Sequence, residues 1–329
     1  MTGEYGISNK QYAAVAAGSL ALAACLVAGI RAGYAAVDAA AATQATADAQ
    51  EALHALEGDI EAAEAMAVTP SNVTDTSAAE AAVAELIADY EDNVYVSVRM
   101  VDGSGSFDFG GGESVQSASM IKLLVLAEYL DQVDSGEISP TDTYELARED
   151  VVSGSGSMQN DRIGTEYTLD EVARRMVYQS DNVATNVLID YLGLEDIAEK
   201  GAELGLSGTQ IAHKLMIAAN DGSSNMISAN DAALILGRIA NDSLASETAC
   251  DRAEEFLLEQ EDDEGLAEGL PEGVAFGHKT GSLDTIRHDG GIVYAEHPYV
   301  ICVLTKNLDY DVANGLMAQI STAVYDALG

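Results

Sequence analysis

The sequence predicts a layered α/β domain with an antiparallel sheet, and two observations predict it. Strand patterns occur near both ends of the domain, at residues 94–109 and 276–305, whereas residues from about 117 to 265 show mainly helical patterns. The sheet is thus assembled from both ends of the domain, with a helical block inserted between them. Short turns such as Glu296-His297-Pro298 join its strands, which makes neighbouring strands antiparallel.

An apolar segment precedes this domain. Residues 12–30 carry no charge, Lys10 stands before them and Arg31 after them, and the run is near the ~20 residues that a membrane-spanning helix needs. We expect residues 1–33 to be a signal anchor that holds the protein outside the cytoplasm. A cleaved signal peptide of a secreted protein, and a lipoprotein processed at Cys25 in a lipobox-like run, are the alternatives.

Residues 34–76 are expected to form an Ala- and Glu-rich helical stalk and a linker. Apolar residues recur three and four positions apart in the stalk, which is typical of a solvated helix with a narrow apolar seam. Pro70 and the Ser- and Thr-rich run after it break such a helix. The folded domain is therefore expected over residues 77–329.

The elements of this domain follow from the spacing of apolar residues. A turn at residues 102–105 joins two strands into a hairpin, and the other strands lie near the C-terminal end. The expected strands are 94–101, 106–109, 276–283, 291–295 and 299–305, and the expected flanking helices are 77–90 and 312–328. They predict a five-stranded sheet flanked by N- and C-terminal helices, plus an inserted all-helical subdomain.

The composition excludes one class of partner. The chain has 55 acidic and 15 basic residues, which gives a formal net charge of −40. Such a surface repels a phosphate backbone and offers no basic stripe to contact one, so we expect no nucleic acid partner. The charge also keeps the protein soluble and makes its copies repel each other.

The cysteines and histidines predict neither a disulfide framework nor a metal site. The chain has 3 cysteines, and Cys302 lies in a run that predicts a buried strand, so we expect an unpaired thiol in the core. The 5 histidines are scattered, without the spacing of metal ligands. We therefore expect no metal and no cofactor.

The first candidate catalytic motif is Ser119-Met120-Ile121-Lys122, which opens an apolar run that predicts a buried helix. Residues three apart share a helical face, so the Lys122 amine is expected beside the Ser119 hydroxyl. A serine becomes an effective nucleophile when a base takes its proton, and a desolvated lysine loses its own proton readily. We expect Ser119 to be the nucleophile and neutral Lys122 its base, although a lone match of this kind recurs by chance.

Two further motifs present polar groups from a turn and from a strand. Ser180-Asp181-Asn182 lies between two helical segments, where a turn can direct a hydroxyl and a carboxamide into a cleft. Lys279-Thr280-Gly281, followed by Ser282, lies on a predicted strand; a cation and a hydroxyl there can hold a substrate carboxylate, and the glycine lets substrate backbone approach. Taken singly, these motifs are more often a polar turn and a charged edge strand.

Together, the three motifs resemble the signature set of class A β-lactamases and penicillin-binding proteins. They occur in the family's order, each in its expected context of helix start, interhelical turn and strand, and the resemblance extends from about residue 80 to the end. It implies the β-lactamase/transpeptidase-like fold. It also implies that Ser119 attacks a carbonyl carbon and that Ser180 relays a proton toward the leaving nitrogen.

The resemblance implies substrate-binding roles as well. Asn182 would bind the substrate amide, and Lys279 and Thr280 would hold its carboxylate. The oxyanion would lie between the backbone N–H groups of Ser119 and Ser282. Arg287 would add positive charge near the carboxylate, or else be a surface residue paired with an acidic neighbour, Asp284 or Asp289.

One feature of class A β-lactamases is missing. That family carries, between the second and third motifs, an omega-loop glutamate that activates the water for release of the acyl group. Residues 205–230 contain no glutamate, and their single acid is Asp221; His213 and Lys214 stand where the loop's usual arginine is expected. The sequence leaves open whether the acyl group is released, with Asp221 as a candidate base.

The resemblance therefore implies an exported serine hydrolase that forms an acyl-enzyme at Ser119 with β-lactams or related amides. A D-alanyl-D-alanine carboxypeptidase of cell-wall peptide metabolism is one alternative, and a penicillin-binding protein that is acylated without turnover is another. The expected partners are a β-lactam or a D-Ala-D-Ala-like peptide as substrate, and a membrane through the N-terminal segment.

Overall fold

The computed structural model describes residues 73–217, 219 and 221–329. The predicted membrane segment over residues 1–33, and all but the last residues of the predicted stalk and linker, lie outside this part of the chain. Within the described part, no helix is both long enough and apolar enough to cross a membrane.

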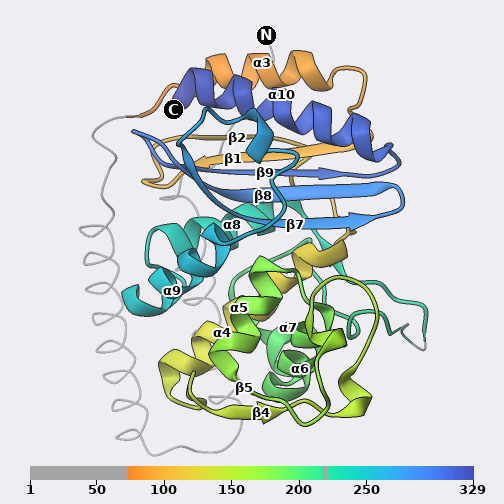
Figure 1. Ribbon diagram of the computed structural model, residues 1–329. Coiled ribbons are helices and arrows are strands. Elements are labelled where there is room, and N and C mark those ends of the chain that lie inside the picture. The colour runs from red at the N-terminus through yellow and green to blue at the C-terminus, as the bar shows by residue number, and fades with distance from the viewer. Residues whose placement is uncertain (1–72, 218, 220) are drawn as a thin grey trace, which may run out of the picture. The chain divides into compact units, whose positions relative to one another are not determined.

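The centre of the domain is a five-stranded antiparallel sheet in the order β2-β1-β9-β8-β7. Its strands are β1 (Val94–Met100), β2 (Ser106–Phe109), β7 (Ala275–Leu283), β8 (Ile286–Tyr294) and β9 (Tyr299–Thr305). The two N-terminal strands join the three C-terminal ones through the β1–β9 pair, where Val94 lies opposite Thr305. The predicted fold class is confirmed (Figure 1).

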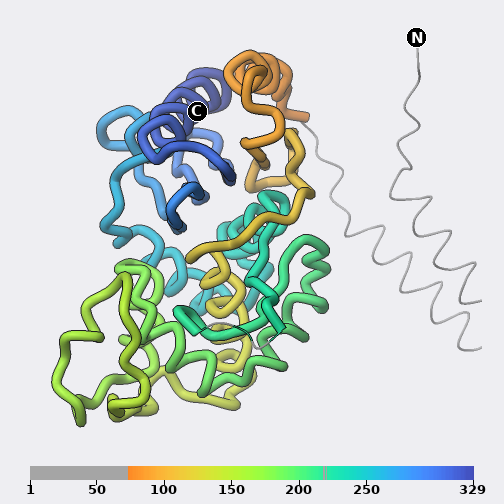
Figure 2. Tube along the Cα trace, turned by 90° about the vertical axis from the view of Figure 1, so that its right-hand side faces the viewer, coloured from red at the N-terminus to blue at the C-terminus, as the bar shows by residue number. Residues whose placement is uncertain are grey.

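Helices α3 (Ser77–Ile87) and α10 (Tyr310–Leu328) lie side by side over one face of the sheet (Figure 1 and Figure 2). Val83 of α3 and Met317 and Ile320 of α10 are fully buried in one core cluster. The helices from the two ends of the domain thus form a single layer, as predicted.

The second face of the sheet is also covered. This is expected because the side chains of β9 are apolar on both faces of the sheet. Ile301 and Val303 belong to the core cluster beneath α3 and α10. Cys302 and Leu304 alternate with them and belong to the core cluster of the helical side. Because successive side chains of a strand point to opposite faces, an uninterrupted apolar strand indicates a sheet that is buried on both sides.

Helices α8 (Ala229–Ala240) and α9 (Glu247–Leu258), the last two helices of the predicted helical block, cover this second face, and the rest of the block lies beyond them (Figure 1). The rest of the block consists of α4 (Lys122–Ser135), α5 (Leu169–Tyr178), α6 (Asn182–Leu192) and α7 (Leu194–Glu203). The central helix is α4, which contacts α5, α6, α7, α8 and α9 and buries every residue from Lys122 to Leu130. The apolar run after Ser119 is therefore the core of the block, as its composition predicted.

Side-chain caps fix where several helices begin. The Thr168 hydroxyl accepts a hydrogen bond from the backbone N–H of Glu171 at the start of α5. The Asp181 carboxylate does the same for Ala184 at the start of α6, and Gly193 ends that helix with a positive φ of 98°. Caps of this kind satisfy backbone donors that have no partner inside the helix.

The structure begins two of the predicted elements earlier and adds two small sheets. Strand β8 begins at Ile286 rather than at residue 291, because the charged residues near its start pair with both neighbouring strands. Helix α10 begins at Tyr310 rather than at residue 312. The helical block also contains small two-stranded sheets, β3 (Val115–Gln116) with β6 (Met226–Ile227) and β4 (Thr143–Glu145) with β5 (Glu166–Thr168).

Truncation of Leu124 tests the central position of α4. Leu124 is 0% exposed and lies against Gly201 of α7. We expect Leu124→Ala to lower the free energy of unfolding by about 2–5 kcal/mol, because it leaves a cavity in the core. Leu258→Ala, at a residue 45% exposed, is the control and should lose less than about 1 kcal/mol. Equal losses in urea titrations of the two variants would contradict the assignment.

Candidate active site

The three motifs meet at the outer edge of β7. A cavity of about 260 Å³ lies there, between β7, the turn before α4 and the α5–α6 turn. Five of the residues predicted for the site line it: Ser119, Ser180, Thr280, Gly281 and Ser282. The remaining predicted residues, Lys122, Asn182, Lys279 and Arg287, are buried around it.

Ser119 lies in a single 3-10 turn, η1 (Ala118–Ile121), which leads directly into α4. The turn places the Lys122 amine 3.1 Å from the Ser119 hydroxyl oxygen. Ser119 is partly exposed, whereas Lys122 is fully buried. The hydroxyl therefore faces the cavity, and the amine lies behind it within proton-transfer distance.

The surroundings of Lys122 favour its neutral form. Its amine donates to the backbone oxygen of Ser180, and it lies 3.0 Å from both the Ser180 hydroxyl and the Asn182 amide oxygen. Burial, and then the nearby charge of Lys279, lower the pKa of Lys122 well below its ordinary value. A lowered pKa increases the share of neutral lysine, which is the form that can accept a proton from Ser119.

Ser180 is held in a strained turn. Its φ is +53°, a conformation that non-glycine residues rarely adopt. The following Asp181 is fully buried and accepts hydrogen bonds from the backbone N–H groups of Met158 and Ala184. Because Asp181 is fixed on both sides, the Ser180 hydroxyl is held at the cavity wall.

A glycine loop over residues 153–157 supports this turn. Its Gly156 has a φ of +95°, and a Cβ added there would lie 2.2 Å from the Asp181 carboxyl group. The Asn182 amide donates to the backbone oxygen of Ser153, also in this loop. No side chain fits between the loop and the turn.

Lys279 is the second amine of the site. It is fully buried on β7 and donates to the Ser180 hydroxyl at 3.0 Å and to the backbone oxygen of Thr280 at 2.7 Å. Burial lowers the pKa of Lys279 to about 7, although Asp262 and Asp289 favour its charged form. The Ser180 hydroxyl thus lies between two amines, Lys122 and Lys279.

The free edge of β7 supplies a backbone donor beside Ser119. In the β7–β8 pair Ser282 lies opposite Arg287, whose backbone N–H and oxygen both bond to Thr305 of β9. The backbone N–H of Ser282 therefore points away from β8, toward the free edge. A Cβ added at the neighbouring Gly281 would lie 3.0 Å from the backbone nitrogen of Ser119. The backbone N–H groups of Ser119 and Ser282, which are predicted to bind the oxyanion, are thus on the same side of β7.

The profile described as Beta-lactamase enzyme family matches residues 78–328 of the chain. The chain belongs to this family. The resemblance expected from the three motifs is confirmed.

Matches to curated β-lactamases are local. β-Lactamase CARB-4 of Pseudomonas aeruginosa is 28% identical over 101 residues, which is 31% of this chain and 35% of that protein. A β-lactamase of Rhodobacter capsulatus is 31% identical over 116 residues, 34% of this chain and 39% of that protein. The chain thus spans little more than a third of the curated relatives that it matches.

Solved structures match over nearly their whole length. A β-lactamase of Sphaerobacter thermophilus has a TM-score of 0.71 and 29% identity, covering 78% of this chain and 98% of that one. PBP-A has a TM-score of 0.70 and 25% identity at the same coverage. A variant of PBP-A was solved as an acyl-enzyme complex with penicillin G.

Arg287 differs from the sequence-based expectation. It is buried rather than at the surface, with 1% exposure, and its partner is Asp262 rather than Asp284 or Asp289. Its side chain also donates to Asn314 of α10 and to the Ser282 hydroxyl. Arg287 lies beside the expected carboxylate site, as predicted, but an acidic residue of the protein already neutralises its charge. The sequence analysis missed Asp262, because it lies in an acidic run typical of a solvated loop.

Asp221 does not resemble a catalytic base of this family. Its side chain is exposed, and its carboxylate accepts hydrogen bonds from the backbone N–H and the hydroxyl of Ser223. These bonds lower the pKa of Asp221. Among the described residues, no contact joins it to Ser119. The neighbouring Lys214, near the place expected for an arginine, forms an ion pair with Asp190 instead.

Two of the histidines, His278 and His288, are buried and bonded to neighbouring strands or loops. His278 bonds to Asp289 at 2.9 Å, and His288 lies between the backbone of Gln116 and that of Thr305. Burial lowers the pKa of His288 to about 4, so this imidazole is neutral. Among the described residues, no group of three His, Cys, Asp or Glu side chains could hold a metal ion.

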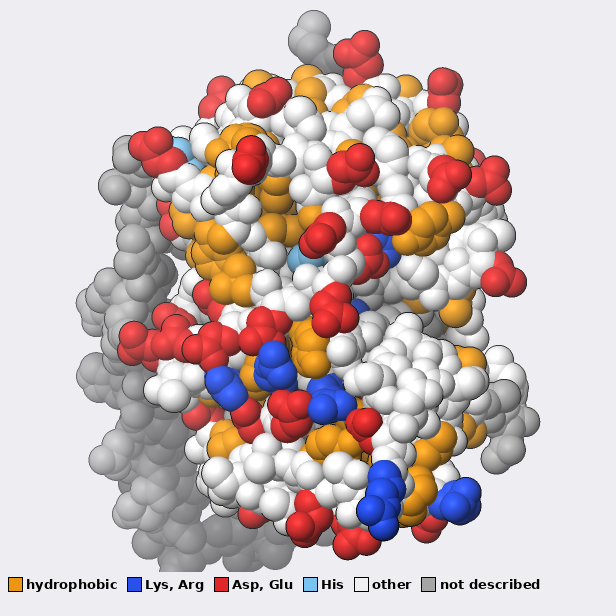
Figure 3. Space-filling model, in the orientation of Figure 1, with side chains coloured by type: hydrophobic (Ala, Val, Ile, Leu, Met, Phe, Trp, Pro, Cys, Tyr) orange, Lys and Arg blue, Asp and Glu red, His pale blue; other side chains and the backbone are white. Residues whose placement is uncertain are grey.

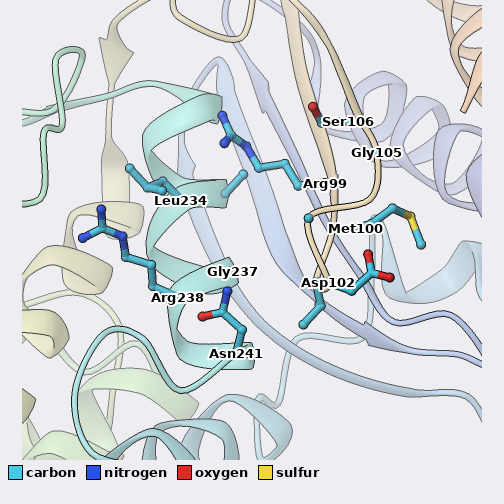
Figure 4. Close-up of a pocket in the computed structure, with 12 residues that line it drawn as sticks. Arg99, Met100, Asp102, Gly105, Ser106, Leu234, Gly237, Arg238 and Asn241 are labelled. Atoms are coloured by element: carbon cyan, nitrogen blue, oxygen red, sulfur yellow. The ribbon is translucent and has the colours of Figure 1, made fainter. Parts of the chain in front are cut away.

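A second cavity lies on the other side of α8, between that helix and the β1–β2 turn. Its volume is about 320 Å³, and Arg99, Asp102 and Asn241 are among the residues around it (Figure 4). None of the motif residues lines it. The cavity at β7, although smaller, is therefore the candidate active site.

Gly156→Ala tests the support that the glycine loop gives to the Ser180 turn. The added methyl group would displace Asp181, so we expect acylation by a fluorescent penicillin to slow at least tenfold. Gly164→Ala is the matched control: Gly164 has a similar φ of +89°, but the nearest atom to its added Cβ lies 3.6 Å away. It should keep the acylation rate within about twofold while straining the backbone. Equal slowing in both variants would contradict the proposed support.

The pKa of Lys279 predicts how acylation depends on pH. As the pH rises through about 7, the Lys279 ammonium loses its proton and with it the charge that orients Ser180. We expect labelling rates to fall above this pH. In Lys279→Arg the guanidinium stays protonated, so the fall should shift to higher pH. Rates measured between pH 5.5 and 9.5 check this; an unshifted profile would assign the fall to another group.

Proposed function

We propose that this protein is an exported serine hydrolase that forms an acyl-enzyme at Ser119 with β-lactams or related amides. One observation carries the proposal: Ser119, Lys122, Ser180 and Lys279 form a continuous chain of hydrogen bonds beside a cavity. Membership of the β-lactamase family, and the penicillin G complex of the PBP-A variant, support it.

The chain of hydrogen bonds provides a path for the proton. Neutral Lys122 takes the proton of Ser119 as its oxygen attacks the carbonyl carbon. The Ser180 hydroxyl, bonded to Lys122, then passes a proton to the leaving nitrogen, while protonated Lys279 fixes the orientation of that hydroxyl. The backbone N–H groups of Ser119 and Ser282 stabilise the oxyanion, each by about 3–4 kcal/mol in enzymes of this kind.

Slow release of the acyl group is part of the proposal. The stretch from residue 205 to 230 lacks a glutamate, and its single acid, Asp221, is turned to Ser223. The carboxylates that line the cavity, Glu261 and Asp262, lie after α9, outside the stretch in which the family's glutamate is expected, and Asp262 is bonded to Arg287. We therefore expect a long-lived acyl-enzyme with penicillins.

A second candidate is a D-alanyl-D-alanine carboxypeptidase, which would release the acyl group that a D-Ala-D-Ala peptide leaves on Ser119. The missing glutamate favours it, since the same acylation chemistry serves these proteins. PBP-A is a solved structure that the chain resembles, at 25% identity. The difference between the candidates lies in what releases the acyl group.

Three substrates discriminate these functions. The full-length protein is mixed with a fluorescent penicillin, a chromogenic cephalosporin and a D-Ala-D-Ala peptide. We expect stable labelling by the penicillin, which Ser119→Ala should abolish and Lys122→Ala should slow at least a hundredfold. Turnover of the cephalosporin would instead favour a β-lactamase, and release of D-alanine a carboxypeptidase. A protein inert to all three would refute the proposal.

Export and anchoring through residues 1–33 are also proposed. The uncharged run between Lys10 and Arg31 supports a signal anchor. Fractionation of cells that express the full chain and a chain without residues 1–33 tests it. The full chain should remain with the membrane, and the shortened chain should not. Radiolabelled lipid on the full chain, lost in Cys25→Ser, would show a lipoprotein instead.

A further inference from the structure

Asp262 lies among the groups that are expected to hold a substrate carboxylate. Its two carboxylate oxygens accept hydrogen bonds from Nη1 and Nη2 of Arg287, at 2.7 and 2.9 Å. The Thr280 side chain interacts with the same carboxylate, and the Asp262 charge favours the protonated form of Lys279. An anion that belongs to the protein therefore already occupies this position.

The carboxylate of Asp262 is charged and firmly bound. Burial opposes its ionisation, but the hydrogen bonds and the charge of Arg287 outweigh burial and hold the pKa of Asp262 below its ordinary value. Two parallel bonds between a guanidinium and a carboxylate are among the stronger polar contacts of proteins. Arg287 is 1% exposed, so loss of its partner would leave a buried charge uncompensated.

The segment that carries Asp262 is fixed at both of its ends. Near the start, the Gln260 side chain donates to the backbone oxygen of Val177 in α5. Near the end, the backbone N–H of Leu266 donates to the buried carboxylate of Asp289 in β8. The segment thus bridges the helical block and the sheet. Displacement of Asp262 by an incoming anion would have to break its two hydrogen bonds with Arg287.

The same segment adds further negative charge at the cavity. Glu261 also lines the cavity, and the run from residue 259 to 264 contains no basic residue. Acidic side chains are spread over this face of the molecule, whereas the exposed basic ones gather over its helical half (Figure 3). An anionic ligand would approach against this potential.

We propose that Asp262 is a specificity-determining residue that selects against a free carboxylate beyond the scissile amide. The preferred substrate class is an amide that carries an uncharged group there, such as a carboxamide. A second carboxylate would meet the charge of Asp262 in a partly desolvated cavity, where like charges repel strongly. A carboxamide N–H can instead donate a hydrogen bond to Asp262. The inference rests on the proposed acylation of Ser119, and it favours amide substrates over a D-Ala-D-Ala carboxylate.

A matched pair of ligands tests this selection: benzylpenicillin and its carboxamide. In the full-length protein, we expect the carboxamide to acylate Ser119 at least tenfold faster than the free acid. Asp262→Asn keeps the shape and one acceptor for Arg287 but removes the charge, so it should lower this preference at least tenfold. Glu261→Gln is the control, because it removes a neighbouring charge that does not contact Arg287. It should change the preference less than threefold.

Binding to Ser119→Ala, measured by calorimetry, separates this inference from the acylation proposal. Preferential binding of the carboxamide without labelling of wild-type Ser119 would refute acylation and support the role of Asp262. Equal or tighter binding of the free acid would overturn that role, and so would absence of binding by both compounds. The comparison of the two ligands in protein that retains Asp262 tests the inference even if the Asp262→Asn variant does not fold.

Discussion

The structure of the site depends on two amines that are buried without carboxylate partners in direct contact. Lys122 and Lys279 both bond to the Ser180 hydroxyl rather than to an acid. Burial disfavours an ammonium ion, and two neighbouring ammonium ions disfavour each other. Burial, and then the nearby charge of Lys279, lower the pKa of Lys122. Because Lys122 is the first residue of the buried helix α4, the role proposed for it as a base depends on the packing of the helical block.

Much of the fold was predictable because the spacing of apolar residues in this chain matches the strands and helices that are buried in the structure. The uninterrupted apolar run of β9 predicted a buried strand, and the run after Ser119 predicted a buried helix. The start of β8 was not predictable from periodicity. Its Arg287, His288 and Asp289 are charged or titratable yet buried, and only their partners in other segments explain this.

The candidate site, like the fold, was predictable from the sequence only in part. Ser119 and Lys122 could be placed together because three residues span one helical turn, and the motif order of a known family placed Ser180 and Lys279 beside them. Asp262 could not be found in this way. Its neighbours in the sequence are acidic and solvated, and its partner Arg287 is distant along the chain. Long-range pairs of this kind leave no periodic trace in a sequence.

The β1–β9 pair has a consequence for how this domain reaches its native state. Val94 of β1 pairs with Thr305 of β9, so β1 cannot form this pair until β9 has been synthesised. Until that part is synthesised, one side of β1 lacks its neighbour and the apolar layer of α3 lacks α10. Closure of such a long loop is slow, and incomplete chains expose apolar surface. The sheet can thus be completed only after β9 has been synthesised, and loss of β9 and α10 would separate β1 and β2 from β8 and β7.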